Sequence, residues 1–184
     1  MATAFSAVIA TADVACLLLR AAPRLADDSI KSALDRLRAP ARDRDIAILI
    51  EDRVDLVRGM GADGVHLSLP VAYDEARRRL GPDLIVGVAC ETRDDAITVA
   101  EHGADYVAFG DFDDPSAAQA TLDLTEWWGE IMTVPCIGAG CAGARDAARL
   151  AAAGADFIAI GAAAWETPLG LADTLRDIRA NLAV

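Results

Sequence analysis

The sequence predicts a single α/β domain over residues 1–184, folded as a compact (β/α)8 barrel. Its length suits one domain, and 54% of its residues are hydrophobic, enough for a sizeable core. A Gly-Ala-Asp motif followed by an apolar run occurs at Gly61, Gly103 and Gly154, each time after a helical pattern. Such helix–glycine–strand junctions indicate parallel strands, because parallel strands need helical crossovers.

The expected elements follow in order along the chain. Strands are expected at Phe5–Ala10, Val14–Leu19, Ile46–Ile50, after Gly61, at Leu84–Val88, after Gly103, at Val134–Gly138 and after Gly154. Helices are expected at Ser29–Leu37, Asp52–Arg58, Tyr73–Leu80, Arg93–His102, Asp123–Met132, Ala144–Ala153 and Leu169–Asn181. Only Thr11–Asp13 separates the first two strands, so the first helix of the barrel is expected to be absent or shortened. An open doubly wound sheet with fewer strands is the alternative.

The charge balance excludes several classes of function. Asp and Glu number 29 against 17 Lys and Arg, a net charge of −12, which disfavours nucleic acid and anionic membranes as partners. Lys31 is the only lysine and sits in a polar stretch, so lysine Schiff-base chemistry is excluded. No apolar run reaches the ~18 residues of a membrane span, and the N-terminus lacks a basic signal region. A cytoplasmic protein is expected.

Five segments agree with a known family in their order and spacing. They are Ile48–Leu56, Gly61–Leu67, Ile85–Val88, Gly103–Gly110 and Pro135–Gly140. Together they resemble the thiamin phosphate synthase and thiazole tautomerase superfamily. The resemblance implies a barrel that binds a phosphorylated small molecule and condenses hydroxymethylpyrimidine pyrophosphate with thiazole phosphate, with magnesium as cofactor.

The resemblance also implies site residues, several of which differ here. Arg20 matches a family cation and is the expected catalytic residue; Asp52 matches a magnesium ligand. The family positions that carry other residue types are Leu18, Ala22, Val71, Ala89 and Glu91. The loop that normally supplies threonines and a lysine to the pyrophosphate is acidic, with Asp111, Asp113 and Asp114. This acidic loop is interpreted either as a metal-binding segment or as a solvated one.

A phosphate site is expected at the loops after the last two strands, where barrels often bind phosphate through backbone N–H groups and a helix N-terminus. The expected residues are Gly138, Ala139, Gly140, Cys141, Gly161, Ala162 and Arg145.

Three functions remain open from the sequence. The first is thiamin phosphate synthesis with a weakened site. The second is a non-catalytic barrel that binds a phosphorylated ligand, and the third is a tautomerase-like isomerase that uses Glu91 with Asp52 as acid and base. Asp52 also has a structural interpretation as a helix cap. A second copy of the chain is the one macromolecular partner left open: of Trp127 and Trp128, one ring is expected to pack on the barrel and the other to lie at a subunit contact.

Overall fold

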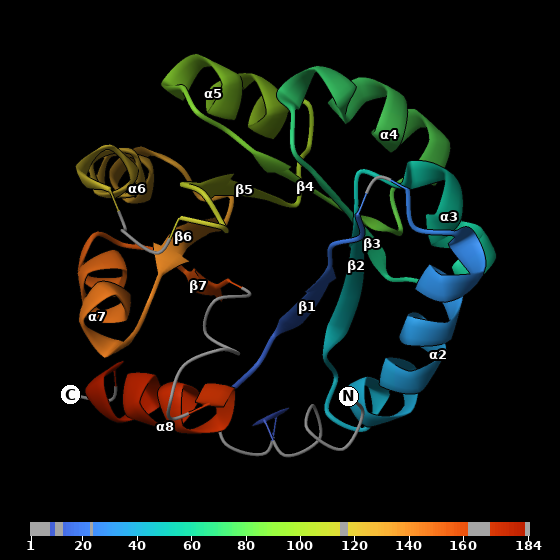
Figure 1. The fold of residues 1–184 in the computed structure, drawn as a ribbon. Coiled ribbons are helices and arrows are strands. Elements are labelled where there is room, and N and C mark those ends of the chain that lie inside the picture. Colours follow the sequence, from blue (N-terminus) through green and yellow to red (C-terminus); the bar gives the residue numbers. More distant parts are fainter. Residues whose placement is uncertain (1–7, 10–12, 23, 115–117, 162–169, 183–184) are drawn as a thin grey trace.

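Seven parallel strands curl around a common centre and carry their helices on the outside (Figure 1). The computed structural model describes residues 8–9, 13–22, 24–114, 118–161 and 170–182. The strands are β1 (Cys16–Leu19), β2 (Ala47–Glu51), β3 (Gly64–Leu67), β4 (Ile85–Ala89), β5 (Tyr106–Phe109), β6 (Cys136–Cys141) and β7 (Phe157–Ile160). The helices are α2 (Asp27–Arg42), α3 (Val54–Met60), η1 (Pro70–Ala72), α4 (Tyr73–Leu80), α5 (Arg93–Glu101), α6 (Gln119–Ile131), α7 (Ala144–Ala152) and α8 (Gly170–Leu182).

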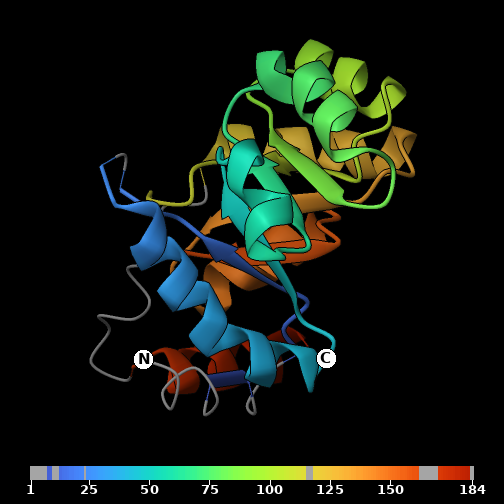
Figure 2. The same ribbon diagram turned by 90° about the vertical axis from the view of Figure 1, so that its right-hand side faces the viewer.

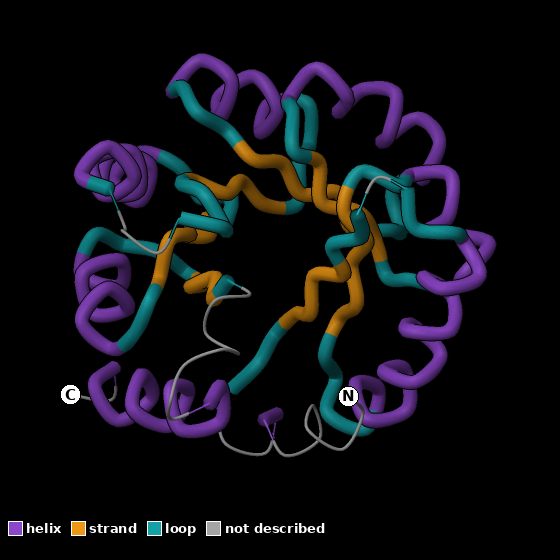
Figure 3. Tube along the Cα trace, in the orientation of Figure 1, coloured by secondary structure: helices purple, strands orange, loops and turns teal. Residues whose placement is uncertain are grey.

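Over the described residues the sheet is a curled half-barrel of seven strands, and the closed eight-stranded barrel that the sequence predicts is not shown there. Strands follow each other in the order β1 to β7, and among the described residues β1 pairs only with β2 and β7 only with β6. Helices form an outer layer on the convex side of the strands, as the turned view in Figure 2 and the tube in Figure 3 show. Sequential order with helices on one face also excludes the doubly wound alternative, whose strand order reverses.

The first expected strand is the main difference. Of Phe5–Ala10, only Val8 and Ile9 belong to the described residues, and both are helical and buried. A short apolar run has no periodicity that separates a buried strand from a buried helical turn. The remaining strands and helices lie where the sequence predicts them, and α4 has the predicted bounds.

Strand β6 runs further than expected. It ends at Cys141 instead of Gly138, so the four residues expected in a phosphate loop lie inside the strand and are buried. The pairing of β6 with β7 shifts register between Gly138 and Cys141, and Gly140 takes a φ of 84°. Glycine permits that conformation without strain. The glycines therefore mark an irregular strand end.

The Gly-Ala-Asp motif has a structural role at all three sites. Each aspartate lies just before a strand and accepts a hydrogen bond through Oδ2 from a backbone N–H of the preceding strand. The three pairs are Asp63 with Ile48 at 2.7 Å, Asp105 with Val86 at 2.7 Å and Asp156 with Cys136 at 2.8 Å. These carboxylates fix the register of neighbouring strands where they enter the sheet. None of the described helices has the length and apolarity needed to span a membrane.

Candidate functional site

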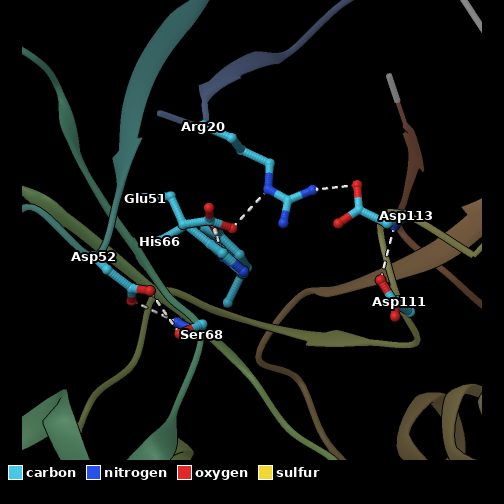
Figure 4. A network of polar contacts seen from close by, with 8 residues as sticks. Arg20, Glu51, Asp52, His66, Ser68, Asp111 and Asp113 are labelled. Carbon is cyan, nitrogen blue, oxygen red and sulfur yellow. Dashed lines mark hydrogen bonds and ion pairs between the residues drawn. The ribbon is translucent and has the colours of Figure 1, made fainter. Parts of the chain in front are cut away.

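The carboxyl ends of the strands meet on one face of the curled sheet, which we call the mouth. Parallel α/β sheets place their ligand sites at this end. Arg20 follows β1, Glu51 ends β2, His66 lies in β3, and Asp113 belongs to the segment after β5 (Figure 4). Residues far apart in the sequence therefore form one polar network.

Arg20 is held between two carboxylates. Its Nε donates to Glu51 Oε1 at 2.7 Å, and its Nη1 donates to Asp113 Oδ1 at 2.7 Å (Figure 4). The hydrogen bond to Asp113, followed by the pairing with Glu51, raises the pKa of the Arg20 guanidinium above its usual value. Two negative charges against one positive charge leave this group with a net charge of −1.

The segment Asp111–Asp114, which we call the acidic strap, reaches across the mouth from β5. Its Asp113 N–H donates to Asp111 Oδ1 at 2.8 Å, which shapes the turn. The Phe112 ring lies 5.8 Å from the Arg20 Cζ and meets the His66 ring edge-on at 5.1 Å. A Cβ at Gly161, just past β7, would collide with the Phe112 carbonyl oxygen. The strap thus lies against Arg20 just past β1, His66 in β3 and Gly161 just past β7.

His66 and Tyr106 line the interior beneath the mouth. His66 is 1% exposed, its Nδ1 lies 2.9 Å from the Tyr106 hydroxyl, and the two rings stack at an interplanar angle of 8°. Burial lowers the pKa of His66 to about 4, so its imidazole is neutral at pH 7. Tyr106 is not among the site residues expected from the sequence. Its signal is Gly87 in β4, because a glycine inside a strand often marks a close approach, and a Cβ there would overlap the Tyr106 ring.

Asp52 is tied to the end of β3. Its N–H donates to the His66 carbonyl at 2.9 Å, and its φ of 53° is rare for a residue with a side chain. Its Oδ1 accepts from the Ser68 N–H at 2.8 Å and its Oδ2 from the Ser68 hydroxyl at 2.6 Å. These hydrogen bonds make Asp52 a link between the segments that follow β2 and β3. Asp52 is therefore not the cap of α3, whose N-cap is Arg53, and its carboxylate is not isolated.

The expected magnesium site rests on Asp52 alone. Val71, at the position of the second family carboxylate, is 87% exposed in η1. No group of three or more His, Cys, Asp or Glu converges among the described residues. A carboxylate has about four lone-pair sites, so Asp52 keeps acceptor capacity beside its Ser68 bonds. It fits as one ligand of a magnesium ion whose other ligands come from substrate phosphates and water, the usual arrangement for this ion.

The structure places Glu91 outside the network. Glu91 is exposed in the bend after β4 and forms no hydrogen bond or ion pair with the other described site residues. Its role as acid or base stays a prediction.

The expected phosphate residues are divided between two environments. Gly138, Ala139, Gly140 and Cys141 are buried in β6. Arg145 is exposed in the first turn of α7, and Gly161 follows β7, whereas Ala162 lies outside the described residues. The Ala142 N–H donates to Asp146 Oδ2 at 3.2 Å at the start of α7. The N–H groups of Asp146 and Ala147 donate to the Gly143 carbonyl at 3.1 and 3.0 Å, whereas the N–H groups just before them have no carbonyl one helical turn earlier to accept their hydrogen bonds.

Comparisons by sequence point to one family, and a comparison with solved structures matches the fold. The family model described as thiamine monophosphate synthase matches residues 2–164. A thiamine-phosphate synthase from Rhodospirillum centenum is 40% identical over 184 residues, covering 96% of this chain and 87% of the relative. One from Erythrobacter litoralis is 39% identical over 137 residues, covering 70% and 64%. Among solved structures, a thiamine phosphate pyrophosphorylase from Pyrococcus furiosus superposes with a TM-score of 0.83 at 20% identity, covering 99% of this chain and 89% of the other.

Proposed function

The chain belongs to the thiamine monophosphate synthase family, and we propose that it binds a phosphorylated ligand of that reaction at the mouth but condenses the two substrates slowly. The comparators for this rate are members of the family with a cationic loop after β5. Binding can persist without fast catalysis because the start of α7 offers an anion site of its own, whereas stabilisation of the leaving group depends on Arg20.

The observation that carries the proposal is the pairing of Arg20. In the condensation, the thiazole nitrogen forms a bond to the pyrimidine methylene carbon, and pyrophosphate leaves with the electrons of the broken C–O bond. Cations near the leaving group stabilise this developing charge, and loss of one such donor typically costs ~10²–10³ in rate. Here Arg20 is paired with Glu51 and Asp113, and the strap adds Asp111 and Asp114.

Phosphate binding is supported by α7. A helix N-terminus attracts anions through its unpaired N–H groups and its dipole, without any lysine. Arg145 in the first turn adds a positive charge. At the mouth, Arg20 uses Nε and Nη1 for its carboxylates, so Nη2 remains as a donor for a ligand. His66, neutral at pH 7, adds no charge.

Magnesium enters the proposal together with the substrate. When bound it would neutralise the diphosphate charge, and Asp52 would hold it as the one protein carboxylate. Asp52→Asn is then expected to weaken the magnesium dependence of pyrophosphate binding, measured by calorimetry with and without the metal.

A non-catalytic phosphate-binding barrel is the limiting case of the same proposal. The acidic strap favours it, since an acidic segment stands where the family resemblance implies a lysine. The tautomerase-like reaction depends on Glu91 and Asp52, and the hydrogen bonds of Asp52 to Ser68 do not favour it.

The binding part is tested at Gly143, the N-cap of α7. A Cβ there meets nothing within 4 Å, and its φ of 176° suits any residue. Gly143→Asp therefore places a carboxylate at the helix N-terminus without strain and is itself a good N-cap. Calorimetry with thiazole phosphate is expected to show at least tenfold weaker binding than in the wild type. The neutral control Gly143→Asn should stay within threefold, and equal affinity for all three proteins would contradict this site.

A further inference from the structure

We propose that the acidic strap is a built-in competitor for anionic ligands, with Asp113 occupying Arg20 until a diphosphate displaces it. This inference rests on the proposed function, because it concerns how a phosphorylated ligand reaches the same mouth.

The strap is positioned by contacts on three sides. Asp113 pairs with Arg20 beyond β1, the Phe112 ring lies against Arg20 and His66, and the Phe112 carbonyl lies against Gly161 after β7. The contacted residues belong to, or directly follow, strands that lie in different parts of the curled sheet. The strap therefore lies across the mouth and does not extend outward into solvent.

Two glycines, Gly110 and Gly161, permit the strap to lie across the mouth. Gly110, which leads into the strap, has a φ of 92°, and a side chain there would collide with Thr121. Gly161 leaves room for the Phe112 carbonyl, where any Cβ would collide with it. The closed strap thus depends on a backbone fit as well as on charge.

The closing ion pair is weak enough for a ligand to replace it. The Arg20 and Asp113 side chains are 37% and 65% exposed, and exposed ion pairs contribute little to stability because water screens them. A diphosphate carries more charge than one carboxylate and accepts hydrogen bonds from the guanidinium in the same way. Ligand binding would then break Arg20–Asp113 while Arg20–Glu51, which is less exposed, remains.

The test uses Asp113→Asn, with Asp111→Asn as the matched control. Both variants remove one negative charge from the strap, but only Asp113 touches Arg20; an asparagine at 111 still offers an acceptor to the Asp113 N–H. Gly161→Ala, which prevents closure without changing charge, is a second variant.

Two quantities are measured on each full-length protein. One is the rate at which phenylglyoxal labels Arg20, followed by peptide mass spectrometry, and the other is the affinity for inorganic pyrophosphate without metal.

Asp113→Asn and Gly161→Ala are expected to label at Arg20 about three- to tenfold faster than wild type, with Asp111→Asn within twofold. Asp113→Asn should also bind pyrophosphate about three- to tenfold more tightly. An unchanged Arg20 labelling rate in Asp113→Asn, or equal acceleration in Asp111→Asn, would overturn the proposal that Asp113 of the strap occupies Arg20. If labelling accelerates as expected but no protein binds pyrophosphate, the shielding of Arg20 by the strap is supported and the proposed function fails instead.

Discussion

Asp105 is the strand-entry carboxylate whose loss should destabilise the fold most. Its Oδ2 accepts from the Val86 N–H at 2.7 Å and from Arg77 Nη2 at 2.6 Å. Val86 is fully buried. Asp105→Ala therefore leaves the Val86 N–H without an acceptor, which lowers the free energy of unfolding by about 1–3 kcal/mol. The ion pair adds less, since Asp105 is 43% exposed and Arg77 keeps its bond to the Leu84 carbonyl. We expect the free energy of unfolding to fall by about 2–3 kcal/mol.

Urea unfolding followed by tryptophan fluorescence measures this loss. For a domain of this size, 1 kcal/mol corresponds to about 2–4 °C, so the melting temperature should fall by about 4–12 °C. Asp105→Asn keeps an acceptor oxygen and loses only the charge, and should lose about 1 kcal/mol. If Asp105→Ala unfolds within 0.5 kcal/mol of wild type (roughly the range of a neutral surface substitution), the carboxylate does not hold the strand register.

Two further predictions concern the interior beneath the mouth. The folded-state pKa of His66, about 4, lies below its unfolded value of 6.5, so the folded state binds fewer protons and loses stability as pH falls from 6.5 toward 4. The loss should reach about 3 kcal/mol in wild type and disappear in His66→Asn, as measured by urea unfolding at each pH; parallel curves for the two proteins would refute it. Gly87→Ala should cost about 1–3 kcal/mol because its methyl group meets the Tyr106 ring. The control Gly59→Ala, in α3 with open space around it, should gain about 0.5–1 kcal/mol, and a loss there as large as at Gly87 would contradict the packing argument.

Local sequence patterns predicted much of the fold. The Gly-Ala-Asp motifs located three strand entries, since glycine ends the preceding helix and the apolar run starts a strand. The charged helix Tyr73–Leu80 was predicted with its bounds because its apolar residues recur at helical spacing. The closure of the sheet was not predictable in this way. It depends on whether residues near Val8 form a strand, and a short apolar run does not decide that.

The site was less predictable because its contacts join distant segments. Arg20 was identified from its match to a family cation, but its partners Glu51 and Asp113 lie 31 and 93 residues away. Pairing at such separation has no local sequence signal. The glycines of β6 predicted a loop, whereas the register shift at Gly140 keeps them in the strand. The acidic residues of the strap are visible in the sequence, where they were interpreted as metal-binding or solvated, whereas the pairing of Asp113 with Arg20 was not predicted.

Restoring the missing charges separates the site from the scaffold. Val71→Asp returns the second family carboxylate, and Ala118→Lys adds a cation where the segment after β5 leads into α6; both positions are exposed. A gain in thiamin phosphate formation over wild type would show that charge limits catalysis. No gain, with binding of thiazole phosphate unchanged, would place the limit in the scaffold.

The most direct measurement is steady-state formation of thiamin phosphate. Purified wild-type protein is supplied with hydroxymethylpyrimidine pyrophosphate, thiazole phosphate and magnesium, beside a family member that has a lysine in the loop after β5. Because a single lost donor already costs ~10²–10³, kcat should be at least about 100-fold below that of the comparator while thiazole phosphate still binds. A kcat within about tenfold of the comparator would contradict the proposal, because Arg20 paired with Glu51 and Asp113 would then suffice for the reaction.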